Sequence, residues 1–478
     1  MSIDFQNAFR STSLRWFNLV MKRMEFPQGF IDWFWTMYRG PATMIVVNRY
    51  KSEKIFIERG FMEGHTPSMA AFVLQMIPLT NALEEVLTGI LVKGVQHKVK
   101  GFADDVKVFL KDVKELDMCY EVIKGFEEVS GLEMHRDPRR EKCQALPFGI
   151  HKENLSWPMW VTVKSEIKVV GIIFTNKQDN FEKVNMEQVE RSFYMALRSC
   201  TGIKGTLNQK IYCVNTYMFT KLWYSSQVVK MDKKKMDEMV KASMNFIYAG
   251  ENERPVRPLN FRPKHLGGLG LIDINTKAKA LLFRSMIKQK TENEKLKEMY
   301  GYDKKWEKLV EVFDETTPVK EIYIEMLKEI YEKNGSVIPS RNEKRRRNIK
   351  WSRVWKNLEK IKGLNAREAE FAWKLTQDML PIGSRIHRAN VDKECKNSIN
   401  IDGDVCRDIP DITHTFITCK GIENTFDSFK DTLQSILGYR VNNTEIITLS
   451  FTHRNQRKRK IAIWFAVKVL NGIYIKLS

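Results

Sequence analysis

Two adjacent aspartates, Asp104 and Asp105, lie between two short β-rich runs and constrain the fold of the first third of the chain. Residues 96–102 and 106–110 predict a hairpin with both carboxylates at its tip. Because neighbouring carboxylates repel unless a cation lies between them, the pair indicates a metal site. Asp4 follows another β-rich run, and we expect it to meet the tip at one sheet edge as a third ligand for Mg²⁺. Turn chemistry is the alternative interpretation, since aspartate also favours turns.

The order of the predicted elements indicates an α+β fold. A strand at 2–5, helices at 14–24 and 29–38, a hairpin at 43–58, a helix at 67–87, the aspartate hairpin and a helix ending at Ser130-Gly131 follow one another. This order predicts an antiparallel sheet with helices on one face. Residues 181–287 are predicted to be helical, and the region after them mostly helical.

The excess of positive charge indicates a polyanionic partner. The chain has 79 Lys and Arg against 58 Asp and Glu, which gives a formal net charge of +21. Basic surface gains free energy by releasing the counterions condensed on phosphate, so we expect a nucleic acid. A merely soluble basic protein is the alternative.

The spacing of the cysteines and the length of the apolar runs indicate the cellular compartment of the protein. The seven cysteines are scattered without close pairs, which argues against a secreted disulfide framework. The apolar runs are too short to cross a bilayer. We therefore expect a nuclear or cytoplasmic protein that is not secreted and has no membrane partner.

Short sequence blocks stand in a consistent order from residue 1 to about residue 285. They are Asp4-Phe5-Gln6-Asn7-Ala8-Phe9-Arg10, Arg59-Gly60-Phe61-Met62-Glu63-Gly64-His65-Thr66-Pro67-Ser68, Phe102-Ala103-Asp104-Asp105, Ser130-Gly131-Leu132 with Lys142, Lys168-Val169-Val170-Gly171-Ile172, and the downstream groups Lys204-Gly205, Asn215, Lys221-Leu222-Trp223-Tyr224 and Arg262-Pro263-Lys264 with Gly267-Gly268-Leu269-Gly270-Leu271. In order and spacing these blocks resemble the reverse transcriptases of non-LTR (LINE-type) retrotransposons. The resemblance rests on the ordered series of blocks, because no single block is strong evidence by itself.

The resemblance implies a role for each matching residue. Asp4, Asp104 and Asp105 would bind two Mg²⁺ (or Mn²⁺) ions for dNTP addition to a primer 3′-hydroxyl. The other implied site residues are Phe9 as the steric gate against a ribose 2′-hydroxyl, Arg59, Gly60, Gly64 and Ser68 in the loop that supports the template base and the incoming nucleotide, Lys142 beside the triphosphate, and Lys168 and Gly171 in the primer grip. A core aromatic for Phe9 and a surface lysine for Lys142 are the alternatives. The implied partners are an RNA template, a DNA primer and dNTPs, in a nuclear or cytoplasmic ribonucleoprotein.

The resemblance also divides the chain into segments. It implies a palm at 1–179, a helical thumb or connection at 180–287, a charged helical linker at 288–369, a degenerate zinc-knuckle-like segment at 370–425 and a basic C-terminal tail at 426–478. The family's fingers precede the first catalytic block, and Asp4 leaves no room for them. We therefore expect an N-terminally truncated element, and unaided polymerase turnover by it is not expected.

Several departures from the family pattern affect the expected site. Arg10 replaces an acidic residue, Glu63 replaces glutamine, and His65-Thr66-Pro67 replace Cys-Pro-Leu. A glutamate beside template or nucleotide is unfavourable near phosphate unless Arg59 or Arg10 offsets its charge.

A Cys/His group near the C-terminus resembles the zinc knuckle of the same elements. Cys406, His414 and Cys419 fit the last three ligands, and Gly403 occupies the position of the first. Cys395 is the substitute within reach, although its spacing is wrong for a compact knuckle. Three ligands would leave an open position unsuited to structural zinc. The alternative is a decayed motif whose thiols pack as small apolar groups.

Three functions follow from these patterns. The first is an RNA-directed DNA polymerase of the LINE type that uses two metal ions. The second is a catalytically silent nucleic-acid-binding remnant of such an element, which tracks a backbone with its basic thumb and tail. The third is a relic that folds poorly. A basic run at 454–460 predicts a nuclear-import signal or a phosphate-contacting helix end, with a solvated helix face as the alternative.

Overall fold

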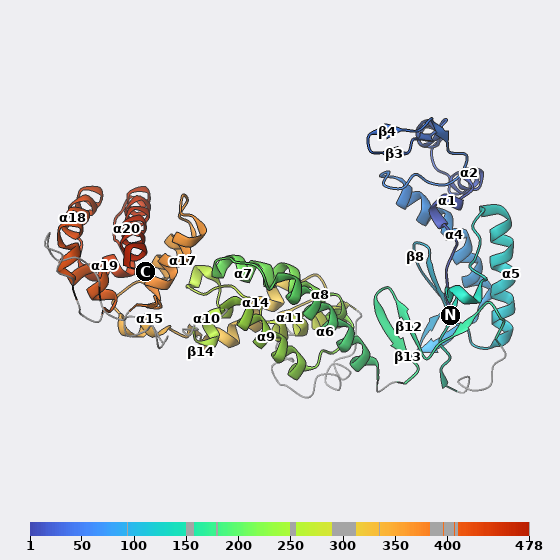
Figure 1. The fold of residues 1–478 in the computed structure, drawn as a ribbon. Coiled ribbons are helices and arrows are strands. Elements are labelled where there is room, and N and C mark those ends of the chain that lie inside the picture. The colour runs from blue at the N-terminus through green and yellow to red at the C-terminus, as the bar shows by residue number, and fades with distance from the viewer. Residues whose placement is uncertain are drawn as a thin grey trace. The chain divides into compact units, whose positions relative to one another are not determined.

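The fold comprises two compact units (Figure 1). A computed structural model describes residues 1–92, 94–149, 157–177, 180–248, 255–288, 312–333, 335–382, 395, 406 and 410–477. The chain divides into an N-terminal unit, Met1–Lys183, and a C-terminal unit, Val184–Ser478. Strands and helices are both present, so the predicted mixed α+β class is confirmed. The finer segment boundaries stay predictions, and residues 289–311 of the predicted linker lie outside the described residues.

A five-stranded sheet with the order β11-β10-β1-β9-β8 forms the centre of the N-terminal unit. Its strands are β1 (Ser2–Ile3), β8 (Val99–Phe102), β9 (Asp105–Val108), β10 (Gln144–Ala145) and β11 (Thr162–Val163). The pairs are antiparallel except for β10–β11, which is parallel. The prediction of an antiparallel sheet is therefore wrong for the β10–β11 pair. The connection across residues 146–161 is long enough for the crossover that a parallel pair needs.

Helices of the N-terminal unit bury one another and the sheet. They are α1 (Ala8–Ser11), α2 (Leu14–Arg23), α3 (Gln28–Tyr38), α4 (Ser68–Val86) and α5 (Val113–Ser130). Helix α4 packs against β8, α2 and α5. The Ser13 hydroxyl accepts the Trp16 N–H at the start of α2, and Gly131 ends α5 with φ +74°, as the sequence predicts.

Four small two-stranded ladders complete the N-terminal unit. They pair β2 (Ala42–Thr43) with β5 (Ile55–Phe56), β3 (Val46–Val47) with β4 (Tyr50–Lys51), β6 (Ile90–Val92) with β7 (Val95–His97), and β12 (Glu166–Val169) with β13 (Ile172–Thr175). The hairpin expected at 43–58 is confirmed by the first two. Asn48 and Arg49 form its turn with φ +48° and +73°.

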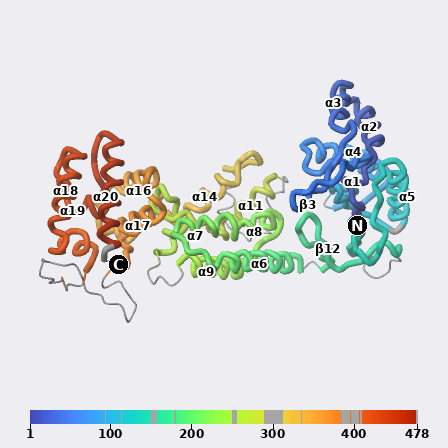
Figure 2. Tube along the Cα trace, turned by 45° about the horizontal axis from the view of Figure 1, so that its top comes forward, coloured from blue at the N-terminus to red at the C-terminus, as the bar shows by residue number. Residues whose placement is uncertain are grey.

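The C-terminal unit is mainly helical (Figure 2). Its first group comprises α6 (Phe181–Cys200), α7 (Leu207–Cys213), α8 (Thr220–Trp223), α9 (Lys233–Tyr248), α10 (Arg257–Phe261), α11 (Ile274–Lys288) and α14 (Val319–Tyr331). Helix α11 packs against α8, α9 and α14. The helices expected at 181–287 are thus confirmed.

A second helical group follows along the chain in the same unit. It comprises α15 (Arg341–Arg345), α16 (Trp351–Glu359), α17 (Ala366–Thr376), α18 (Glu423–Leu437), α19 (Asn443–Thr448) and α20 (Gln456–Leu477). Helices α18 and α20 lie side by side (Figure 1), and α17 packs against α20. Phe371, Leu433 and Ala466 belong to their shared core. Among the described residues, no helix has the length and hydropathy required to span a membrane.

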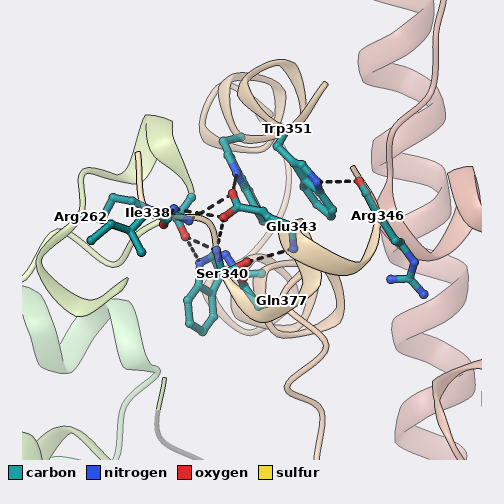
Figure 3. A network of polar contacts seen from close by, with 10 residues as sticks. Arg262, Ile338, Ser340, Glu343, Arg346, Trp351 and Gln377 are labelled. Carbon is teal, nitrogen blue, oxygen red and sulfur yellow. Dashed lines mark hydrogen bonds and ion pairs between the residues drawn. The ribbon is translucent and has the colours of Figure 1, made fainter. Parts of the chain in front are cut away.

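A buried ion pair joins the two helical groups of the C-terminal unit (Figure 3). The Arg262 guanidinium is 1% exposed and donates to both carboxylate oxygens of Glu343, at 3.1 and 3.2 Å. Trp355 Nε1 and the Ser340 N–H donate to the same carboxylate, at 2.8 and 2.5 Å. A Cβ atom on Gly268 would lie 1.9 Å from the Arg262 carbonyl oxygen, so this loop requires glycine there.

Glu343→Gln is expected to lower the free energy of unfolding by about 3–5 kcal/mol, because it leaves the Arg262 charge buried without a carboxylate. Chemical unfolding followed by tryptophan fluorescence measures the loss. The control is Glu325→Gln, which breaks the exposed Glu325–Lys328 pair and is expected to change the value by less than about 0.5 kcal/mol. Equal small losses in both variants would contradict a stabilising function for the buried pair.

Candidate active site and metal cluster

The strand register places the backbones of the three predicted aspartates at one edge of the sheet. Ser2 pairs with Lys107 and Ile3 with Val106, so Asp4 follows directly beside the start of β9. In the β8–β9 hairpin Phe102 pairs with Asp105, and Ala103 and Asp104 form the tip. Ala103 has φ +55°, which a two-residue tip of this kind requires.

Basic side chains lie against two of the three carboxylates. Asp4 Oδ2 lies 3.6 Å from His135 Nε2 and 3.6 Å from Lys142 Nζ. Asp105 pairs with Lys107, whose ammonium also donates to the Ser2 hydroxyl at 2.5 Å. The three aspartates do not form a group of ligand atoms within 4.8 Å of one another, in contrast to the one such group found in the described residues. The Lys107 and Lys142 ammonium groups therefore balance charge that a bound metal would otherwise balance.

The three carboxylates offer oxygen donors to a metal at this edge, and His135 Nε2 lies 3.6 Å from Asp4 Oδ2. Cys143 Sγ lies 4.0 Å from the Asp4 carbonyl oxygen. Burial raises the pKa of the Cys143 thiol, which disfavours its thiolate form. Carboxylates without a thiolate suit Mg²⁺ or Mn²⁺.

A long-range backbone pairing, which the sequence does not predict, brings His135 to Asp4. Phe5 and Met134 form an isolated bridge, and the His135 N–H donates to the Asp4 carbonyl oxygen at 2.9 Å. A second pairing, of Ser2 in β1 with Gln144 in β10, brings Lys142 back to Asp4. The sequence predicted Lys142 at the site but not His135. The family pattern includes a basic residue at the position of Lys142 and none at position 135.

The loop predicted to support template and nucleotide lies against the first catalytic block. The Gly60 N–H donates to the Thr12 carbonyl oxygen at 2.8 Å, and Phe61 donates to the Phe9 carbonyl oxygen at 2.7 Å. Arg10 Nε and Glu63 Oε1 are 3.0 Å apart. Arg10 therefore offers the charge compensation that the glutamate was expected to need.

The remaining predicted site residues differ in their surroundings. The half-buried Phe9 ring stacks on Phe72 with 4.7 Å between centroids. The buried Ser68 hydroxyl donates to the Met62 carbonyl oxygen at 2.7 Å, so it holds the loop. Arg59 and Lys168 are exposed, and Lys168 lies on β12 two residues before the turn.

The β12–β13 turn is tight, as predicted for the primer grip. Val170 and Gly171 form it with φ +45° and +86°. Positive φ at both central residues is the geometry that lets a two-residue turn join twisted strands.

Gly60→Ala is expected to lower the free energy of unfolding by about 2–3 kcal/mol. Gly60 has φ +90°, and an added Cβ would lie 2.6 Å from the Arg10 carbonyl oxygen. Gly64→Ala in the same loop is the matched control, because Gly64 has φ +78° but no atom within 4 Å of an added Cβ. We expect it to cost about 1 kcal/mol. Thermal and urea unfolding of both variants measure the difference, and equal losses would contradict the close approach.

A second site lies in the C-terminal unit, where three thiols and one imidazole converge. The ligand atoms of Cys395, Cys406, His414 and Cys419 all lie within 4.8 Å of one another. Cys395 Sγ and Cys419 Sγ are 3.6 Å apart, as are Cys406 Sγ and His414 Nε2. The Asp411 carboxylate accepts the His414 N–H at 2.6 Å. Three cysteines and one histidine are a complete ligand set for a closed structural Zn²⁺ site.

The structure corrects the interpretation of this cluster. The sequence predicts three ligands with an open fourth position and treats the spacing of Cys395 as wrong. That objection is wrong, because the Cys395 thiol joins the other three. A spacing rule describes a compact knuckle, whereas here Cys395, Cys406 and Cys419 belong to a larger buried core. Gly403 lies outside the described residues.

Comparison with known families identifies the N-terminal region. Residues 1–174 match the family model described as reverse transcriptase (RNA-dependent DNA polymerase). The match runs from β1 into β13 and includes Asp4, Asp104 and Asp105. These residues form a reverse transcriptase domain, which implies use of an RNA template, a primer and dNTPs. Domains of this family normally use divalent metal ions, in agreement with the oxygen donors at the sheet edge.

Proposed function

We propose that the chain is an RNA-directed DNA polymerase of a LINE-type element, which adds dNTPs to a primer by two-metal nucleotidyl transfer. The observation that carries the proposal is the β1–β9 register, which sets Asp4 beside the Asp104-Asp105 tip within a reverse transcriptase domain. The ordered blocks shared with LINE-type enzymes support the subtype. The net charge of +21 suits a nuclear or cytoplasmic ribonucleoprotein.

The residues around the edge have separable tasks in this proposal. Asp4, Asp104 and Asp105 would hold Mg²⁺ or Mn²⁺, which neutralises charge developing on the attacking and leaving oxygens. Lys142 lies beside Asp4 and can supply a positive charge to the triphosphate. Phe9, supported by Phe72, would exclude a ribose 2′-hydroxyl.

The loop and the hairpin would position the nucleic acids. Gly60, Gly64 and Arg59 lie in the loop that would contact the template base and the incoming nucleotide, and Ser68 fixes that loop from inside. The turn at Gly171, beside Lys168, would hold the primer end.

Primer extension tests the proposed polymerase. The full chain is incubated with an RNA template, a labelled DNA primer, dNTPs and Mg²⁺. Against the expectation of no unaided turnover that the family pattern gives, the proposal requires extension, which is expected to stop with EDTA and to return with excess Mg²⁺ or Mn²⁺. Extension that continues unchanged without any divalent ion would overturn the metal assignment. Failure to extend while RNA is bound would select the second candidate.

The second candidate is a catalytically silent nucleic-acid-binding protein. Two observations favour it, namely the pairing of Asp105 with Lys107 and the closeness of His135 and Lys142 to Asp4. If the Lys107 and Lys142 ammonium groups replace the metal ions permanently, the domain retains its affinity for nucleic acid without nucleotidyl transfer. RNA binding that falls steeply with salt, without dNTP incorporation in Mg²⁺ or Mn²⁺, would establish this function.

The Cys/His cluster is proposed to bind Zn²⁺ in a structural role. Cys395, Cys406 and Cys419 are buried in the core that includes α18 and α20, so a bound ion would fix these helices together. Four protein ligands leave no open position for a catalytic water.

A further inference from the structure

A cavity of about 920 Å³ opens in the C-terminal unit between two walls. One wall is formed by residues 348–350 and by Arg353 and Asn357 of α16. The other is formed by Lys430 of α18 together with residues 440–445 and 450–452. We call this cavity the basic groove.

Four cations line the basic groove and have no acidic partner. They are Lys350, Arg353, Lys430 and Arg440. Within the part of the chain that the structure describes, no ion pair joins any of the four to a carboxylate. The one acidic lining residue, Glu445, accepts hydrogen bonds from the Asn442 N–H and the Tyr439 hydroxyl, both at 3.0 Å. The groove therefore carries four cations and one carboxylate, and none of the four cations is paired with a carboxylate in the described part of the chain.

Both walls are fixed by buried contacts. On the first, Trp355 of α16 donates to Glu343 in the buried network of Figure 3, and its ring stacks on Trp351 with 5.3 Å between centroids. On the second, Leu433 and Phe429 of α18 belong to the core shared with α20. Cations on two rigid walls are preorganised for an anion, which lowers the entropic cost of binding it.

The lining chemistry distinguishes between possible anions. Small-molecule pockets are mostly apolar, whereas this groove presents amides and hydroxyls between its cations, as at Asn348, Asn443 and Thr452. Phe451 is the aromatic residue in the lining and is only 1% exposed, so no ring there offers a face for base stacking. Contacts would fall on phosphates and sugars, which makes binding independent of sequence.

We propose that the basic groove binds a single nucleic-acid strand through its phosphodiester backbone. Its volume is that of a cleft for a few nucleotides. The basic runs at 344–347 and 454–460 lie next to its lining segments in the sequence. This site goes beyond the proposed polymerase, because it holds a strand outside the reverse transcriptase domain and serves either candidate function.

The test is charge reversal on the two walls of the full chain. Lys350→Glu with Arg440→Glu is compared with Lys320→Glu and Arg367→Glu, which are exposed, lie outside the groove and change the net charge equally. Fluorescence anisotropy with a labelled single-stranded RNA measures Kd between 50 and 200 mM KCl, and Kd is expected to rise about tenfold or more only in the groove variant. The slope of log K against log salt should decrease by about 1.4, which corresponds to two lost phosphate contacts on a single strand.

Controls separate the remaining outcomes. Circular dichroism and the melting temperature of each variant confirm folding, and single-stranded DNA of the same length shows whether the 2′-hydroxyl contributes. Equal weakening in both variants would overturn the groove assignment. Tighter binding of a duplex, or displacement of RNA by poly-glutamate at equal charge, would overturn the assignment to a nucleic-acid strand. Primer extension by Asp104→Asn is independent of this result, so failure of the proposed polymerase and failure of the groove are distinguishable.

Discussion

Asp104→Asn is expected to lower the rate of dNTP incorporation by at least about 10³-fold, or about 4 kcal/mol of transition-state stabilisation. The residue lies at the tip of the β8–β9 hairpin, and its carboxylate makes no hydrogen bond or ion pair in the described part of the chain. Its negative charge therefore has no structural task there, and the free energy of unfolding should remain within about 0.5 kcal/mol of the wild-type value. Single-turnover primer extension on an RNA template measures the rate, and urea unfolding measures stability.

Two further variants separate catalysis from stability. Asp117→Asn removes the same charge from an exposed position on α5 and should leave the rate unchanged. Asp105→Asn should lose incorporation and also stability, because Lys107 is 8% exposed and would lose its carboxylate partner. Incorporation that survives Asp104→Asn combined with Asp105→Asn would refute the site, whatever the stability of the variant.

Local signals predicted much of the N-terminal unit correctly. The Gly131 C-cap and the aspartate hairpin each depend on a few neighbouring residues, and each lies where the sequence placed it. Such signals operate because backbone dihedrals and end-group hydrogen bonds are decided within one turn of chain.

Long-range pairings were less accessible to sequence reasoning. Nothing near Thr162 indicates that β11 joins β10 in parallel, and nothing near His135 indicates a bridge to the segment after β1. The buried Arg262–Glu343 pair joins residues 81 positions apart. Composition marked Glu343 as part of a charged, solvated stretch, whereas the fold buries it, because charge density alone does not report which carboxylate finds an internal partner.

The Cys/His cluster shows the same limit of prediction from sequence at a candidate functional site. Three of its four ligands were identified by spacing, and Cys395 was set aside on spacing. Distance along the chain restricts a site only when the intervening segment is short. A ligand supplied from across a hydrophobic core is set by packing, which a single sequence does not specify.

Cys395→Ser is expected to abolish stoichiometric zinc binding and to lower the melting temperature of the C-terminal unit by on the order of 10 °C. The purified full chain should contain about one zinc ion by mass spectrometry, since three thiolates and one imidazole complete a tetrahedral set. Because the ligands are buried in the core with α18 and α20, the free energy of zinc binding adds to the stability of that core. Removal of the ion with a chelator should reproduce the loss in the wild-type chain and have no further effect on the variant.

The matched control uses the other thiol pair of the same unit. Cys200 Sγ and Cys213 Sγ are 3.4 Å apart, but they do not belong to the four-residue ligand group. Burial raises the pKa of Cys213 to about 11, which opposes thiolate formation and metal binding there. Cys213→Ser should therefore retain zinc and respond to the chelator as the wild type does. Absence of zinc from the wild-type chain would show that the cluster is a packed group of thiols, and one zinc ion in both the Cys395→Ser and the wild-type chains would show that Cys395 is not a ligand.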